Sequence, residues 1–376
     1  MTARKHVRAW AQLRLLCCSG VPVMSVVPEV CAIARELMPE SVGALFLTDG
    51  QGVPHAFFHE DSPPSVQALF RSEPQLFQGD GEYNVFRLVG DVGAPKLGQL
   101  LAPPPEYFAS NTYQLLVRGS GHHHALDARL EPDGQRSGLL SVFRPPGRGF
   151  DRQDLSHLQR IALHVEHALR VGVMPDEASS AAHWTCEAEA MLVANAAGRV
   201  VFASSEAQAL LESLPLCGAV WPDRRRMPAL GSALLERLHD AEQHPGSLPY
   251  ARWPVPGGVL VAHAQWLGLQ GQAPSPACLD VGDGRAADGL VGIVLKRLVP
   301  DPLRVWRALT ATKLPPQALE AAYWLALLGQ RDKVRERMAL SESMMKDCLK
   351  AVYAEFGVSS VAEVAQVLRT PRALAA

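Results

Sequence analysis

The chain has 376 residues, of which 48% are hydrophobic and 20% charged, with a formal net charge of −2. This length predicts two or three domains, and the charge balance excludes a strongly basic nucleic-acid protein. The one early apolar stretch is broken by Gly20, Pro22 and Pro28, so it is too short for a membrane helix. Seven cysteines without a CxxC pair argue against a disulfide scaffold. A cytoplasmic protein without membrane contact is expected.

The first region, residues 1–174, combines helix and strand patterns in an α+β order behind an N-terminal helix. Apolar spacing predicts a helix over 28–37, and a closing helix begins after its cap, Asp151. Between them, alternating residues and turn residues predict two hairpins. Their strands are 42–47 with 56–59, and 122–130 with 137–144.

The run Gly138–Arg144, followed by Phe150 and the closing helix, resembles part of a GAF-type sensory domain. The resemblance implies a ligand pocket between the sheet and the loop-rich stretch 62–111. Six aromatic residues of that region would line it: Phe70, Phe77, Tyr83, Phe86, Tyr107 and Phe108. In the alternative interpretation, these aromatic residues only fill a core beneath a long loop.

Three consecutive histidines, His122 to His124, raise the question of a metal site. In an extended strand, His122 and His124 face one side and His123 faces the other, so at most two ligands converge locally. Histidines packed beside a core are commoner in strands than metal ligands. We therefore predict no metal site and no other cofactor.

The second region, residues 183–298, follows a small-residue linker at 175–182. Residues 190–204 are typical of two short strands joined by a turn, and a helix is predicted over 205–214. This order resembles the start of a PAS domain, with Ser204 where that family usually has Asn. Its later strands would be 259–266 and 290–298, joined by a loop at 273–288. A connecting helix or linker is expected over 299–312.

Four short amphipathic helices are predicted in the last region, residues 313–376. Pro315 and Pro316 suit the first turn of the first helix, and Gly329 suits its end. The second helix covers 331–338. The remaining signals are the N-cap Ser341, an inward stripe on the third helix and a capping box on the fourth: Met345, Leu349, Val352 and Phe356, then Ser360 with Glu363.

The run 314–360 is similar, without a gap, to the helix-turn-helix DNA-binding domain of LuxR-type transcriptional regulators. The match rests on Leu314, Pro316, Glu320, Leu325, Ala326, Arg337, Ser341, Glu342, Lys346 and Phe356 to Ser360. In that family the third helix enters the major groove, and the last helix often forms a dimer contact. The resemblance implies that eight residues contact DNA: Arg331, Lys333, Ser341, Ser343, Met344, Lys346, Asp347 and Lys350.

These parts together predict an α+β chain in which GAF-like and PAS-like sensory domains precede an all-α, four-helix, helix-turn-helix domain. The expected function is that of a bacterial transcriptional regulator. It would bind double-stranded DNA as a homodimer, and an unidentified small molecule in the N-terminal domain would be its signal.

Two alternatives remain open. Arg335, Met344 and Asp347 depart from the LuxR-type pattern, which favours a degenerate regulator that acts through protein interaction, with lost or weakened specific DNA binding. The other alternative is an enzyme that uses Cys31 or the histidines at 122–124. Because the chain contains no HExxH, GxSxG or Gly-rich phosphate loop, we predict no catalytic residues and no enzyme activity.

Overall fold

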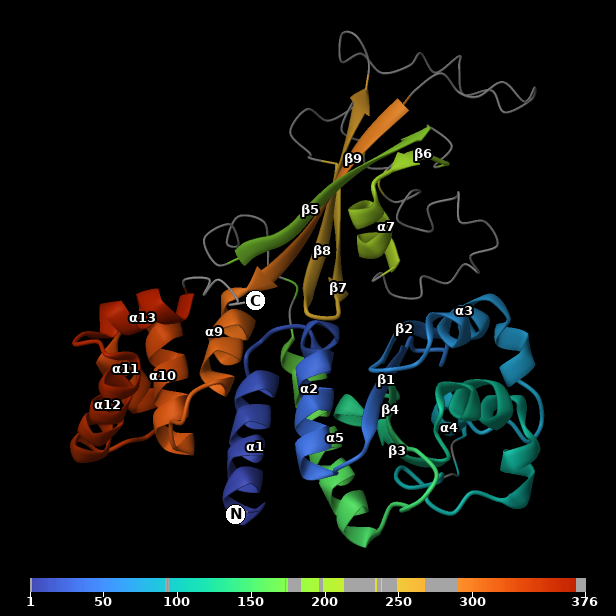
Figure 1. The fold of residues 1–376 in the computed structure, drawn as a ribbon, viewed down its shortest axis with the longest axis horizontal. Helices are drawn as coiled ribbons and strands as arrows, with labels where there is room; N and C mark the ends of the chain where they lie inside the picture. Colours follow the sequence, from blue (N-terminus) through green and yellow to red (C-terminus); the bar gives the residue numbers. More distant parts are fainter. Residues whose placement is uncertain are drawn as a thin grey trace.

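Two separate sheets and a C-terminal group of helices make up the fold (Figure 1). A computed structural model of the chain describes residues 2–91, 93, 95–172, 174, 184–195, 199–212, 234, 238, 249–267 and 290–369. Both sheets in these residues are antiparallel, so the predicted combination of α+β regions with a helical C-terminal region is confirmed. None of the helices in these ranges has both the length and the apolar character that crossing a membrane requires.

The first sheet contains both predicted hairpins and has the strand order β2-β1-β4-β3. Its strands and the helices packed on it are α1 (Thr2–Cys17), α2 (Val23–Leu37), β1 (Val42–Thr48), β2 (Pro54–His59), β3 (His124–Leu130), β4 (Gly138–Arg144) and α5 (Arg152–Val171). The hairpins join through β1 and β4, where Leu45 lies opposite Leu140. The helix predicted over 28–37 begins earlier, at Val23, and contains Pro28.

Apolar residues occupy both faces of this sheet, because successive side chains of a strand point to opposite sides. In β1, Leu45 and Leu47 belong to the core beneath α2 and α5. Ala44 belongs to a second core, together with Leu139 and Phe143 of β4. The sheet therefore lies between two layers, with α2 and α5 on one side and the segment between β2 and β3 on the other (Figure 1).

The stretch 62–111, predicted as loop, contains ordered helical structure. Its helices and short helical turns are α3 (Pro64–Ser72), Pro74–Phe77, α4 (Val85–Gly90) and Pro105–Ala109, and a π-helical segment, Thr112–Val117, follows. The stretch is thus only partly loop, and its helices were not predicted although Pro64, Pro74 and Pro105 each lie in the first turn of one. A proline there removes no hydrogen bond, so it marks the start of a helix rather than an interruption.

The second sheet has the order β6-β5-β9-β8-β7, and a helix follows β6. Its elements are β5 (Trp184–Asn195), β6 (Val200–Ala203), α7 (Ser205–Glu212), β7 (Tyr250–Val255), β8 (Gly258–Leu267) and β9 (Leu290–Pro300). The strands predicted within 190–204, 259–266 and 290–298 are confirmed. β5 begins six residues earlier than predicted. Its first half contains Glu187 and Glu189, so it lacks the apolar pattern expected of a strand. They pair across the sheet with Arg297 and Lys296.

Strand β7 was not predicted, because Pro254 interrupts its pattern. Proline cannot donate to a strand ladder, so it is confined to sheet edges and bulges. β7 is the edge strand of this sheet, and Pro254 lies opposite Val259. The predicted linker at 175–182 and the loop at 273–288 lie outside the described residues, as do residues 370–376.

The C-terminal region consists of helices alone. They are α9 (Asp301–Thr310), α10 (Pro316–Leu328), α11 (Arg331–Arg337), α12 (Glu342–Phe356) and α13 (Val361–Arg369). Gly329 and Gly357 end α10 and α12 in the left-handed conformation, with φ of 66° and 64°. The hydroxyl of Ser341 accepts from the backbone N–H of Met344 at 3.2 Å, which caps α12 as predicted. The connecting helix and all four C-terminal helices are thus confirmed.

Helix α1 lies between the first sheet region and the C-terminal helices (Figure 1). It packs on α2 and α5 on one side and on α9 and α10 on the other, within one continuous core. The buried indole N–H of Trp306 in α9 donates to the carbonyl of Gln12 at 3.0 Å. On the surface of this junction, Arg14 pairs with Glu320 of α10. The N-terminal helix and the first helices of the C-terminal region therefore stabilise each other.

Candidate functional site

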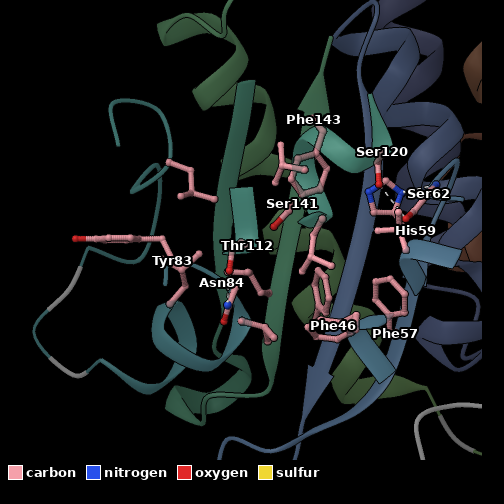
Figure 2. Close-up of a pocket in the computed structure, with 18 of the residues that line it drawn as sticks. Phe46, Phe57, His59, Ser62, Tyr83, Asn84, Thr112, Ser120, Ser141 and Phe143 are labelled. Carbon is pink, nitrogen blue, oxygen red and sulfur yellow. Dashed lines mark hydrogen bonds between the residues drawn. The ribbon is translucent and has the colours of Figure 1, made fainter. Parts of the chain in front are cut away.

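A cavity lies between the first sheet and the helical segment that follows β2, where the resemblance placed a ligand pocket (Figure 2). Its volume is about 60 Å³. The lining residues used below are Phe46, Phe57, His59, Ser62, Phe70, Tyr83, Asn84, Val85, Leu88, Leu100, Tyr107, Thr112, Ser120, Leu139, Ser141 and Phe143. The space therefore suits a small molecule.

Three of the six aromatic residues predicted to line a pocket do so: Phe70, Tyr83 and Tyr107. Phe77 is fully buried in the neighbouring core instead. Phe86 packs against that core, and its ring lies 6.1 Å from that of Phe70. Phe108 is 37% exposed and stacks on His123. The pocket interpretation thus holds for some of these six aromatic residues, and the core interpretation holds for others.

The sheet supplies lining residues that sequence reasoning did not select. Phe46, Phe57 and Phe143 line the cavity from β1, β2 and β4. The ring centroids of Phe46 and Phe57 lie 4.8 Å apart, and both rings contact that of Phe70, at 5.8 and 5.6 Å. The signal was present in the alternation of β1, where every second residue from Val42 to Phe46 joins the cavity-side core.

His59, Ser62 and Ser120 form a polar corner of the cavity (Figure 2). The two serine hydroxyls lie 3.0 Å apart, and Nδ1 of His59 accepts from the backbone N–H of Ser62 at 3.2 Å. Burial lowers the pKa of His59 to about 4, so the imidazole is neutral at physiological pH. Nδ1 also lies 3.4 Å from Oδ1 of Asp61, and Nε2 makes no hydrogen bond within the described residues.

A second polar group lies on the opposite side of the cavity in Figure 2. The side-chain amide of Asn84 donates to Thr112 Oγ1 at 2.7 Å and to the carbonyl of Phe77 at 2.8 Å. The carboxylate of Glu82 accepts from the backbone N–H of Thr112 at 2.8 Å. These bonds fix the π-helical segment against the start of α4 and leave little free hydrogen-bonding capacity there.

The hydroxyl of Tyr107 is a polar lining group without a hydrogen-bond partner. Tyr107 is 1% exposed, and no described residue lies within hydrogen-bond distance of its oxygen. Burial raises the pKa of this phenol, so it keeps its proton and can both donate and accept. A buried hydroxyl without a partner costs roughly 1–3 kcal/mol, which a bound molecule with a polar atom would offset.

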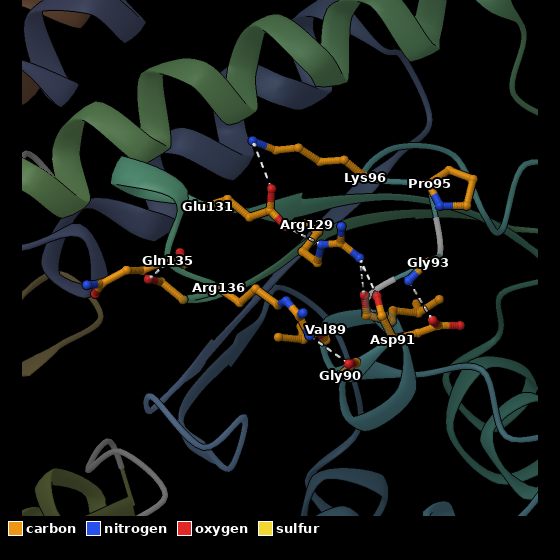
Figure 3. A network of polar contacts seen from close by, with 12 residues as sticks. Val89, Gly90, Asp91, Gly93, Pro95, Lys96, Arg129, Glu131, Gln135 and Arg136 are labelled. Carbon is orange, nitrogen blue, oxygen red and sulfur yellow. Dashed lines mark hydrogen bonds and ion pairs between the residues drawn. The ribbon is translucent and has the colours of Figure 1, made fainter.

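Two arginines hold α4, which forms one wall of the cavity through Val85 and Leu88 (Figure 3). Nη1 of Arg129 donates to the carbonyl of Asp91 at 2.9 Å, and Nη1 of Arg136 donates to that of Gly90 at 2.6 Å. The last carbonyls of a helix lack partners within the helix, so these guanidinium groups satisfy them. The wall is therefore tied to the second hairpin.

Asp127 of β3 fixes the segment that carries Leu100, another wall residue. Oδ1 of Asp127 accepts from the backbone N–H of Leu100 at 2.6 Å. The backbone carbonyl of Asp127 accepts from the backbone N–H of Gly98 at 2.8 Å. The residue is completely buried, and burial raises the pKa of Asp127 to about 6. The wall is therefore held by a carboxyl group that gains its proton more readily than an exposed aspartate.

The second candidate surface is the outer face of α12. Met345, Cys348 and Val352 are buried against the other helices, while Ser343, Lys346, Asp347 and Lys350 are exposed. Met344 is 43% exposed. Within the described part of the chain, neither lysine of this face forms an ion pair. The helix thus presents a polar face with two free cations.

The remaining residues predicted to contact DNA have different surroundings. Lys333 of α11 is exposed. The hydroxyl of Ser341 is engaged as the cap of α12. Arg331 is half-buried and pairs with Glu342, and Nε of Arg335 lies 3.8 Å from the same carboxylate. The pairing with Glu342 neutralises part of the positive charge that the sequence placed before the third helix.

Comparisons with known proteins assign no family to this chain. No family model matches it, and no curated protein matches it. A solved structure, the E. coli DhaR(N)-DhaL complex, contains a similar chain with 15% sequence identity and a TM-score of 0.20. The alignment covers 79% of this chain and 89% of that chain. Because the superposition is this loose, it carries no argument about fold or function.

Proposed function

We propose that this chain is a bacterial, cytoplasmic, DNA-binding transcriptional regulator that responds to a small molecule. In this proposal, a GAF-like region holds the ligand, a PAS-like region follows, and a LuxR-type helix-turn-helix reader binds double-stranded DNA as a homodimer. It assigns no enzyme activity. The observation that carries it is the exposed polar face of α12, on which Lys346 and Lys350 form no ion pair with any described residue.

The arrangement of the C-terminal helices supports this reading. A helix that enters the major groove needs one face buried for support and the opposite face free for base edges. α12 meets this requirement, because its buried residues Met345 and Cys348 flank exposed Lys346. α1 packs mainly on α9 and α10 in this region, so within the described residues it leaves the outer face of α12 open.

Replacing Lys346 tests the reader directly. The purified chain is expected to enrich a palindromic site from random duplexes, with affinity that falls as salt increases. Lys346→Ala is expected to weaken binding to that site by roughly tenfold to a hundredfold, because a base contact is lost. Lys296→Ala, on the second sheet, is the matched control and should leave binding unchanged. Enrichment that Lys346→Ala does not affect would contradict the proposed reading helix.

One observation favours a second candidate function, a regulator that acts through protein contacts. The carboxylate of Asp347 lies on the exposed face of α12, and Glu342 engages Arg331 and Arg335. Both features weaken attraction to phosphates. If no duplex is enriched at any salt concentration, while Asp347→Asn combined with Arg335→Ala creates binding, this second function is the better description.

The cavity supports an uncharged ligand. All of its lining residues lack a formal charge at neutral pH, since His59 is neutral and the set contains no Asp, Glu, Lys or Arg. An anion bound there would lose its hydration without a cation to replace it, at a cost of several kcal/mol. Aromatic walls favour a flat molecule. The His59 corner and the Tyr107 hydroxyl favour one that carries a polar, neutral group.

A pair of probes tests this ligand class. Benzamide is expected to raise the melting temperature of the full chain, whereas benzoate, of the same size but charged, is expected to have no effect. Ser141→Leu fills the centre of the cavity and should abolish the response to benzamide. Ser65→Leu places the same side chain on the exposed face of α3 and should retain it. Equal stabilisation by benzoate would contradict the neutral class.

A further inference from the structure

Two histidines and one aspartate meet at the edge of the cavity, although one histidine lies about sixty residues after the other two residues in the sequence. His59 ends β2, Asp61 lies in the turn after it, and His122 comes just before β3. Oδ1 of Asp61 lies 3.0 Å from Nε2 of His122 and 3.4 Å from Nδ1 of His59. One nitrogen or oxygen atom from each residue lies within 4.8 Å of the others.

His122 does not occupy the position that the sequence predicted. β3 begins at His124, and Gly121 turns the chain before it with a φ of 81°. The backbone N–H of His122 donates to the carbonyl of Val117, so this residue belongs to the preceding turn. The argument that His122 and His124 share one strand face is therefore wrong. His122 instead faces residues from the first hairpin.

The ring of His122 stacks on those of His59 and Phe143, but its polar atoms have few partners. Its side chain is 7% exposed, and among the described residues the carboxylate of Asp61 is its one hydrogen-bond partner. Its Nδ1 is buried without a partner among the described residues. Asp61 itself is 46% exposed, so the polar partner of this buried imidazole is a surface carboxylate. A bound cation at the shared point would join all three side chains.

The donor set matches a transition-metal site. Imidazole nitrogens and one carboxylate are typical ligands of Zn²⁺, and three protein ligands leave one position open. The imidazole rings of His59 and His122 lie 5.8 Å apart between centroids, with their planes 14° apart. The two rings are stacked, so rotation of one ring about its Cβ–Cγ bond, together with a small movement of the exposed Asp61, would aim a nitrogen of each ring at one ion.

We propose that His59, Asp61 and His122 bind a divalent transition metal ion at the edge of the cavity. The fourth position is left for water or for a donor atom of a molecule in the cavity, which His59 also lines. This inference is independent of DNA binding. A bound ion would add positive charge at the edge of the cavity, so the neutral ligand class argued above applies to the metal-free chain. It concerns binding alone and assigns no reaction.

Metal titration of the full chain tests the site. After chelator treatment, one Zn²⁺ per chain is expected to bind at this site in competition with a chromophoric chelator. Co²⁺ is expected to give the visible absorption of a four-coordinate ion. Asp61→Asn keeps an oxygen that accepts from His122, so an ordinary hydrogen bond would survive this change. Loss of a ligand should instead lower Zn²⁺ affinity by about tenfold or more.

The matched control is His124→Ala, at a histidine two residues away whose Nε2 lies 3.2 Å from the carbonyl oxygen of Gly147 rather than near Asp61. It should leave Zn²⁺ affinity and the Co²⁺ spectrum unchanged, while His122→Ala should abolish both. If His122→Ala does not fold, the Zn²⁺ affinity of Asp61→Asn, a substitution at a partly exposed position, decides the test. Absence of Co²⁺ absorption at micromolar ion, or equal affinity in the parent chain and Asp61→Asn, would overturn the proposal.

Discussion

Asp154→Ala is expected to destabilise the first sheet region by about 3–5 kcal/mol, because it leaves a buried cation unpaired. Arg144 is 2% exposed, and its Nη1 and Nη2 donate to the two carboxylate oxygens of Asp154 at 2.8 and 3.1 Å. The carbonyls of Gly149 and Pro39 accept its other hydrogen bonds. These dipoles cannot replace the lost negative charge.

Urea unfolding of the full chain, with hydrogen exchange of β4 and α5 as the local probe, measures this effect. Glu189→Ala breaks the half-exposed pair with Lys296 and should cost no more than about 1 kcal/mol. The double substitution Arg144→Met with Asp154→Leu removes both charges and should recover most of the loss. If Asp154→Ala lowered the free energy of unfolding as little as Glu189→Ala does, this would show that water reaches the buried pair.

Asp127→Asn is expected to stabilise the chain at neutral pH and to have little effect in acid. Burial raises the pKa of Asp127 to about 6, above the value of about 3.9 in an unfolded chain. The folded state therefore binds the proton more tightly, and stability is lost as the pH rises from about 4 through 6. Two pKa units correspond to about 3 kcal/mol, and this cost is fully present above pH 7.

The measurement is the difference in unfolding free energy between Asp127→Asn and the parent chain, taken from pH 4 to pH 8. The asparagine keeps a side-chain oxygen that accepts from Leu100, so the wall of the cavity should stay in place. Asp80→Asn, at an exposed position, should give a flat difference over the same range. A flat difference for Asp127→Asn as well would contradict the proposed cost of burying the ionised carboxylate.

The elements that could be predicted from the sequence are those specified by local patterns. Both hairpins of the first sheet combine alternating residues with turn residues, and the C-terminal helices combine apolar spacing with caps such as Ser341 and Gly329. Where local signals conflict, prediction failed. The edge strand that contains Pro254 and the helix that begins at Pro64 were both missed.

The candidate site was harder to predict, because it depends on residues brought together by the fold. Phe70 and Tyr107 come from the predicted stretch, but Phe46 and Phe143 come from strands more than ninety residues apart. The contact between His122 and Asp61 depends on one turn at Gly121. Alternation in a sequence gives the face of a strand, yet it does not say what another segment places against that face.

The position of α1 has a consequence for the synthesis of this protein. Arg14 and its partner Glu320 are 306 positions apart, and the buried faces between their helices are apolar. At about 5–20 residues per second, a ribosome needs roughly 15–60 s to make the intervening chain. During that time α1 has no α9 or α10 to cover it. The nascent chain thus carries an unsatisfied apolar surface on α1 until α9 and α10 have been made.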